Sequence, residues 1–381
     1  MTKTRTRLLF GACAAMFVFG IVLAILGVLF GLPEMRERLG VTLIQQGDIF
    51  LALFFGVFLS TIIVGPMIDS FGNKLVLITS SVLVAIALCM FATAHSFLAA
   101  TAAAFALGFG GGGLNTSANA LVADLYPENR GPMLNVVATF YGIGALLIPL
   151  LAATITGVFS IAQLLLTAAA LAAVCAIGYV VLPFPAPREV IGFSLLASLK
   201  AARYPGVLLF GALLFCQSGN EAVIGGWTST YAGSIGATPR VATWILAGYW
   251  AALTLGRVMG ARLLAFVPKT RLVLASAIGS AIGSAVLLAS TSIVILALGA
   301  AIAGLSFAAI YPTTLAIAAD RYQRLAGTIF GLLFATGLCG GMLFPWLVGH
   351  IGQSATLRSG MAVPFVGALV VCTLAVIQSR H

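Results

Sequence analysis

The chain has 381 residues, of which 61% are apolar and only 7% are charged, and its formal net charge is +10. A soluble domain normally has about 25% charged residues, so a soluble enzyme, a disordered chain and a disulfide-stabilised scaffold are excluded. The basic residues stand singly between long apolar runs, which argues against a nucleic-acid partner. Since one membrane crossing takes about 20 apolar residues, the composition predicts an all-α polytopic membrane protein in the lipid bilayer.

Apolar runs between charged and turn residues predict twelve transmembrane helices. We expect them near residues 8–33, 47–68, 74–94, 97–122, 132–157, 160–182, 207–232, 240–265, 270–290, 292–316, 326–350 and 359–377. With the N-terminus in the cytoplasm, 15 of the 19 Lys and Arg residues fall on the cytoplasmic side and 4 on the other. Cytoplasmic loops carry the excess of positive charge, so we expect a multi-pass protein of a bacterial inner membrane with both termini cytoplasmic.

The chain also resembles itself when it is shifted by 196 residues. The shift aligns Gly108 with Gly304, Asp124 with Asp320, Tyr126 with Tyr322, Gly131 with Gly327, Gly144 with Gly340, and Pro149 with Pro345. This duplication predicts two pseudo-symmetric six-helix bundles, 1–182 and 207–381, joined by a cytoplasmic linker, 183–206. Phe193–Ala202 in the linker is expected to form a short amphipathic helix on the membrane surface. Parallel repeats of this kind are typical of transporters with a site at the membrane midplane.

A motif stands between the second and third predicted helices: Gly65-Pro-Met-Ile-Asp69-Ser-Phe-Gly72-Asn-Lys74. It matches the G-x-x-x-D-x-x-G-x-[KR] signature, so the chain resembles the major facilitator superfamily. The glycines would let two helices turn tightly, and Asp69 would meet a helix N-terminus or an arginine of the other half, which closes the cytoplasmic side. Further members of this predicted gate are Asp124, Arg130, Arg257 and Asp320. The alternative is that these are solvated loop charges that only set the topology.

Four stretches resemble a narrower group, the fucose–galactose–glucose symporter family: Gly113–Val122, Phe140–Pro149, Gly219–Trp227 and Tyr311–Thr313. The resemblance implies transport of a hexose or deoxyhexose, usually with protons and in some relatives with sodium. Members with established proton coupling tend to carry one carboxylate in helix 1 and another in helix 4. Here the first predicted helix has no carboxylate, and the helix-4 position is Asn115, so coupling through those two sites is not expected.

Glu221 is the only acidic residue well inside a predicted span, about fourteen residues into the seventh helix. An ionisable group at that depth is costly and usually faces a cavity or a partner. A carboxylate in a low dielectric favours its protonated form, so Glu221 is the candidate site of ion coupling. The alternatives are that it stays ionised to bind sodium or sugar hydroxyls, or that it is structural and joins neighbouring helices.

The predicted substrate site combines polar and aromatic side chains from several helices. Its members are Asn115, Asn119, Tyr141, Gln217, Asn220, Glu221, Trp227, Trp250 and Tyr311. Those around Glu221 lie at helical spacing and should form one stripe. The two helix-4 amides share a face and suit polyhydroxyl ligands, although such amides also join helices in membranes. The three aromatic residues Tyr141, Trp250 and Tyr311 could stack on a sugar. We expect no metal site and no cofactor.

These features favour a monomeric secondary active transporter of a small polar solute, with a sugar as the leading candidate, driven by protons or sodium. It would work by alternating access around a central site. The alternatives are an uncoupled sugar facilitator and a multidrug or metabolite exporter of the same fold. Exporters usually carry G-x-x-x-G-P-x-x-G-G in helix 5, of which Gly144–Ala153 keeps only the first Gly and the Pro. An enzyme is not expected, because no clustered catalytic groups are found.

Overall fold

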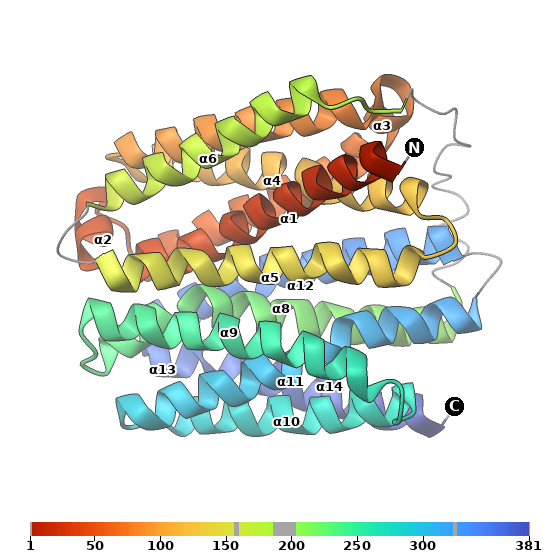
Figure 1. Ribbon diagram of the computed structural model, residues 1–381. Coiled ribbons are helices and arrows are strands. Elements are labelled where there is room, and N and C mark those ends of the chain that lie inside the picture. Colours follow the sequence, from red (N-terminus) through yellow and green to blue (C-terminus); the bar gives the residue numbers. More distant parts are fainter. Residues whose placement is uncertain (1, 156–159, 186–202, 323–325, 381) are drawn as a thin grey trace. The chain divides into compact units, whose positions relative to one another are not determined.

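The computed structural model describes residues 2–155, 160–185, 203–322 and 326–380, and every regular element in those ranges is an α-helix (Figure 1). The long helices are α1 (Thr2–Gly31), α3 (Leu43–Thr93), α4 (Phe97–Leu125), α5 (Arg130–Ile155), α6 (Ile161–Val181), α8 (Pro205–Ser234), α9 (Pro239–Leu263), α10 (Lys269–Ala289), α11 (Ile293–Arg321), α12 (Ala326–Ser354) and α14 (Ala362–Arg380). Two short helices are α2 (Pro33–Leu39) and α13 (Leu357–Gly360). The amphipathic helix predicted in the linker lies outside the described residues.

Eleven of the described helices are long and apolar enough to cross a membrane. One of them, α3, has 51 residues, which at 1.5 Å per residue would make it about 75 Å long. The hydrocarbon core of a bilayer is only about 30 Å thick. The helix is broken at Gly72, where φ is 82° and ψ is 162°. α3 therefore supplies two crossings, and all twelve predicted spans are found in the part of the chain that the structure describes.

The helices form two compact units. Unit 1 comprises residues 1–41 and 48–192, and unit 2 comprises residues 42–47 and 193–381. In unit 1, α1 contacts α4, α5 and α6. In unit 2, α8 contacts α9, α11, α12 and α14. Each unit is thus built around its own first long helix, α1 or α8.

Equivalent helix pairs in the two units pack through equivalent glycines. A Cβ atom at Gly144 of α5 would overlap the carbonyl of Phe17 in α1, and one at Gly340 of α12 would overlap the carbonyl of Phe215 in α8. The 196-residue repeat aligns these two glycines. Small residues let membrane helices approach backbone to backbone. The central helix of each unit therefore packs against its neighbour at an equivalent glycine.

The glycine run of α4, Gly110–Gly113, is packed on several sides. A Cβ atom at Gly111 would meet α1, one at Gly112 would meet the part of α3 before Gly72, and one at Gly113 would meet the part after it. Successive residues point about 100° apart around a helix, so four adjacent glycines open most of the circumference. The run therefore lets α4 lie close to α1 and to both parts of α3.

Candidate functional site

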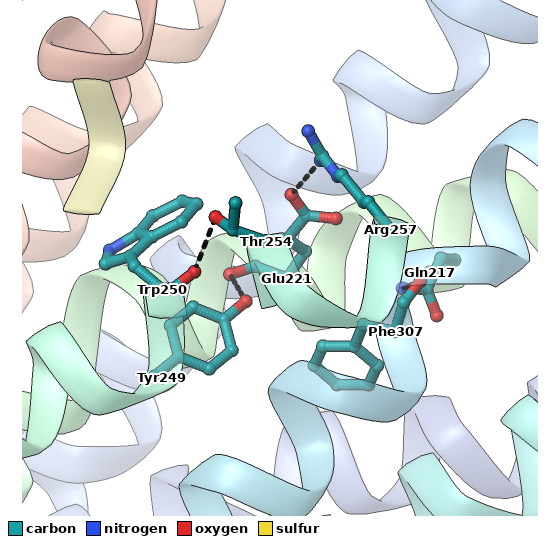
Figure 2. A network of polar contacts seen from close by, with 7 residues as sticks. All are labelled: Gln217, Glu221, Tyr249, Trp250, Thr254, Arg257 and Phe307. Atoms are coloured by element: carbon teal, nitrogen blue, oxygen red, sulfur yellow. Dashed lines mark hydrogen bonds and ion pairs between the residues drawn. The ribbon is translucent and has the colours of Figure 1, made fainter. Parts of the chain in front are cut away.

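An ion pair joins α8 and α9 inside unit 2 (Figure 2). Arg257 Nη2 donates a hydrogen bond to Glu221 Oε1 at 3.4 Å. The two side chains are 26% and 18% exposed, respectively, whereas Gln217, one turn earlier in α8, is fully buried. The two charged side chains are therefore partly exposed, unlike their neighbour Gln217.

Arg257 lies on the side of α9 that faces away from the exposed stripe of that helix. Exposed side chains of α9 form a stripe that includes Trp244, Leu255 and Val258. Arg257 follows Leu255 by two residues, so it lies about 200° around the helix from it. It shares its face with Trp250, seven residues earlier, which is almost fully buried. Arg257 thus points to the interior side of α9.

The acidic member of the ion pair lies near the middle of α8. Glu221 is residue 17 of the 30 in α8, about 24 Å along the axis from Pro205. The hydroxyl of Tyr249 donates to the backbone oxygen of Glu221 at 3.3 Å, and Tyr249 is near the middle of α9. Trp250 lies against Gly225, where a Cβ atom would come within 2.9 Å of the indole Cζ2. These contacts place the carboxylate at mid-helix, beside two aromatic rings.

α11 contributes the third side of this site. Gln217 Nε2 donates to the backbone oxygen of Phe307 at 3.4 Å, while Gln217 Oε1 is buried without a hydrogen-bond partner among the described residues. Tyr311, one turn after Phe307, packs against Gly337 of α12 and lies within electrostatic range of Glu221. The structure thus brings Glu221, Arg257, Gln217 and Tyr311 to one region, with Trp250 at its edge.

The predicted stripe around Glu221 is divided in the structure. Asn220 faces α14: with its amide oxygen and nitrogen exchanged, it donates to the Pro364 oxygen and accepts from the Ala368 nitrogen, both at 3.2 Å. Adjacent residues point about 100° apart, so Asn220 cannot share the face of Glu221. Trp227, fully buried, lies a turn and a half farther along α8. Of these neighbours, Gln217 is the one that the structure places on the face of Glu221.

In unit 1 the predicted site residues border α1. Asn119 Nδ2 donates to Asn115 Oδ1 at 3.0 Å and to its backbone oxygen at 2.8 Å. The same nitrogen lies 4.0 Å from Met16 Sδ of α1. Tyr141 of α5 packs on Phe19 of α1, with ring centroids 5.6 Å apart. The predicted amide pair on one face of α4 is present, and it uses hydrogen bonds within the pair.

The predicted gate motif surrounds the break in α3. Asp69 and Lys74 are half-buried on either side of Gly72, while Gly65 is helical with nothing close to it. Asn73, which sequence reasoning missed, accepts a hydrogen bond from the hydroxyl of Ser117 at 2.9 Å. Asn73 stands inside the motif, between Gly72 and Lys74, and that position was the available signal. This bond ties the break in α3 to α4.

Two other predicted gate residues make contacts within their own unit, and their part in a gate stays a prediction. Arg130 Nε donates to the Ala123 oxygen at 3.1 Å near the end of α4, and Asp124 is exposed there. Asp320 of α11 pairs with Lys269 of α10.

Arg257 differs from what we expected. We counted it among the cytoplasmic charges, but the structure pairs it with Glu221. The sequence did contain a sign of this, because Arg257 lies well before the end of the predicted helix 240–265. Arg257 is therefore part of an ion pair between two helices and not a loop charge.

The chain was compared with known families and structures. The family model of the Major Facilitator Superfamily matches residues 10–234 and again residues 209–380. No curated protein sequence matches the chain at a significant level. The narrower resemblance to fucose–galactose–glucose symporters therefore stays a prediction.

Among solved structures, the nucleoside transporter NupG is similar. The structure of a point mutant of NupG has a TM-score of 0.80 at 15% identity, with 99% of each chain covered. A bacterial homologue of the human lysosomal transporter Spinster, in an inward-facing and occupied conformation, has a TM-score of 0.77 at 14% identity, with 99% of this chain and 97% of that chain covered. At these identities the likeness shows the fold. The twelve crossings and the family match together show a multi-pass membrane protein with the fold of a secondary transporter, and the chain belongs to the Major Facilitator Superfamily.

Proposed function

We propose that the protein is a cation-coupled secondary transporter of a small polar solute, with a sugar or sugar derivative as the solute. It would act as a monomer in a bacterial inner membrane with both termini in the cytoplasm. The observation that carries the proposal is the ion pair of Arg257 with Glu221, which lies near the middle of α8 in unit 2. Ionisable residues inside membrane spans are costly and typically mark solute or ion pathways.

The surroundings of the ion pair suit a solute with several hydroxyl groups. The buried oxygen of Gln217 has no partner among the described residues and can accept from a hydroxyl. Tyr311 and Trp250 offer aromatic surface beside it. NupG, which shares the fold, is described as a transporter of nucleosides, and a nucleoside contains a ribose ring. In unit 1 we propose Asn115, Asn119 and Tyr141 as further solute contacts.

Transport into proteoliposomes tests this function. Uptake of radiolabelled D-glucose, L-fucose, D-glucuronate and uridine would be followed with and without an inward proton or sodium gradient. We expect one of these solutes to accumulate only with a gradient. Accumulation independent of any gradient would instead indicate a facilitator, and outward pumping of apolar drugs would indicate the exporter.

The role of Glu221 is tested by Glu221→Gln. Because the glutamine cannot exchange a proton, we expect this variant to lose gradient-driven accumulation while it still exchanges labelled for unlabelled solute. The matched control is Glu34→Gln on α2, an exposed acidic residue, which should transport normally. If Glu221→Gln accumulates solute like the wild type, Glu221 is structural and the coupling site lies elsewhere.

A further inference from the structure

We infer that the turn between α9 and α10 binds an anionic phospholipid, with Arg262 and Arg271 donating to its phosphate group and its acyl chains lying along the exposed faces of the two helices. The turn consists of residues 264–268, which connect Leu263 at the end of α9 to Lys269 at the start of α10. Figure 1 shows it at the end of unit 2 where the C-terminus lies. The inference goes beyond transport and does not depend on which solute the protein carries.

The turn is apolar, although turns are usually rich in Gly, Pro, Asn, Asp and Ser. Phe266 is 86% exposed, and Leu263 and Leu264 beside it are exposed as well. The next turn of unit 2, residues 290–292, is Ser-Thr-Ser. Large apolar side chains next to basic ones are typical of segments that lie in the surface of a membrane, so the composition of the α9–α10 turn suits contact with lipid.

The length of α10 places this turn at the surface of the bilayer. α10 has 21 residues, which makes it about 31 Å long at 1.5 Å per residue. The hydrocarbon core of a bilayer is about 30 Å thick. A helix of this length has just enough residues to cross, so both of its ends lie close to the lipid head groups. Phe266, three residues before the start of α10, therefore lies at that level.

The exposed stripe of α9 ends at Arg262. Gly248, Ala251, Leu255 and Val258 precede it at steps of three or four residues, and all five are exposed. This spacing keeps them on one face of the helix. The guanidinium of Arg262 thus stands where the apolar face of α9 reaches the end of the helix.

The exposed stripe of α10 begins at Arg271 in the same way. Ala275, Ile278 and Ile282 follow it at steps of four, three and four residues, and all are exposed. Both helices pack against α11, and the five-residue turn keeps their two arginines at the same end of the pair. Two apolar faces that each meet an arginine at this end match a molecule with two acyl chains and one phosphate group.

The acidic side chains of unit 2 do not neutralise these arginines. Residues 193–381 contain two acidic residues, Glu221 and Asp320, which pair with Arg257 and Lys269, respectively. The two arginines of the stripes are exposed and form no ion pair or side-chain hydrogen bond among the described residues. A phosphate group accepts charge-assisted hydrogen bonds from the planar guanidinium, and basic residues beside a membrane attract anionic lipids. The charge of the turn therefore favours an anionic head group.

The corresponding turn of unit 1 lacks both arginines. An offset of 195 residues, one less than that of the repeat, aligns its exposed Phe71 with Phe266 of the α9–α10 turn. In place of the two arginines it has Met67 and Val76. An exposed phenylalanine is therefore common to both turns, whereas the pair of arginines occurs in unit 2. The inferred lipid site thus belongs to unit 2 and is not a general property of the duplicated fold.

Fluorescence quenching by brominated lipids tests this site. Phe266→Trp places a reporter in the turn, and the signal of the 4 natural tryptophans, measured on the wild type, is subtracted. The protein would be reconstituted into vesicles of phosphatidylcholine and phosphatidylglycerol with the same acyl chains, in which one lipid or the other is brominated. We expect phosphatidylglycerol to be preferred at the reporter by roughly 25-fold, which is about fivefold for each arginine.

Arginine variants in the Phe266→Trp background identify the groups responsible. Arg262→Gln and Arg271→Gln should each lower the preference about fivefold, and the two lipids should quench the double variant equally. The matched control is Arg240→Gln, an exposed arginine at the other end of α9, which should keep the full preference. If the double variant keeps it too, or if neither lipid quenches the reporter, the inference is wrong.

Thermal unfolding in detergent needs no reporter and separates a lipid from free phosphate. Phosphatidylglycerol should raise the unfolding temperature of the wild type and of Arg240→Gln more than phosphatidylcholine does, and the two lipids should act equally on Arg262→Gln/Arg271→Gln. Sodium phosphate and glycerol 3-phosphate, which lack acyl chains, should have no effect at the same concentration. If they stabilise the wild type as strongly as phosphatidylglycerol, the site binds soluble phosphate and the inference is wrong. Neither measurement involves transport, so this outcome would leave the proposed function unaffected.

Discussion

The predicted solute contacts Asn115 and Asn119 in unit 1 are neutral amides, whereas Glu221 and Arg257 in unit 2 carry charges. The helix contacts around them are alike, because Gly144 and Gly340 hold equivalent helix pairs in the two units. The difference shows that a duplicated helix scaffold can keep its packing while its interior chemistry diverges. Of these two sets of groups, only the pair in unit 2 can gain or lose a proton.

The shared packing predicts the largest effects. Gly144→Val and Gly340→Val should each destabilise the protein by more than the about 1–3 kcal/mol typical of overpacking, since the new Cβ would overlap a backbone carbonyl in either unit. Thermal unfolding in detergent measures this loss. The controls are Gly178→Val in unit 1 and Gly248→Val in unit 2, positions with nothing within 4 Å. If one of these two glycine substitutions is tolerated and the other is not, the two units do not pack their central helix in the same way.

The break in α3 predicts an effect of intermediate size. Gly72→Ala forces a side chain into a backbone conformation that is essentially restricted to glycine, with φ at 82° and ψ at 162°, at a cost of about 1–3 kcal/mol. The control is Gly65→Ala in the same motif, where the backbone is helical and no atom lies within 4 Å. Thermal unfolding and transport rates of the two variants should differ. If the two variants have the same stability and transport rate, the conformation of Gly72 does not require a glycine.

The hydrogen bonds between the two amides of α4 in unit 1 predict the smallest effect. Asn119→Ala removes the hydrogen bonds to Asn115, and polar contacts between membrane residues contribute about 0.6 kcal/mol on average. We expect a small loss of stability and weaker solute binding, with the dependence on the ion gradient unchanged. Asn135→Ala on the exposed side of α5 is the control. Loss of gradient dependence in Asn119→Ala would move part of the coupling into unit 1.

The twelve crossings could be predicted because the bilayer demands long apolar runs, and such runs are visible without any tertiary structure. The equivalence of Gly144 and Gly340 could also be predicted, because the repeat aligned them before their contacts were known. Both features depend on local sequence or on comparison of the chain with itself.

The partners of the polar residues could not be predicted in the same way. Arg257 is 36 residues from Glu221, and Asn73 is 44 residues from Ser117, so only the packing of helices decides that they meet. The direction of Asn220 depended on helix rotation, since a turn of about 100° separates it from Glu221. Charge counting also assigned Arg257 to the cytoplasmic side, because the positive-inside rule does not consider ion pairs between helices.

The glycine run of α4 has a consequence for how this protein can vary. Most helices have at least one face on which side chains can be exchanged freely, so tolerated positions recur every three or four residues. Along Gly110–Gly113 a Cβ atom would meet a neighbouring atom within 3.0 Å at each position. In a survey of all single substitutions, this segment should therefore appear as four consecutive intolerant positions. Variation in unit 1 would have to occur around α4 rather than within this turn of it.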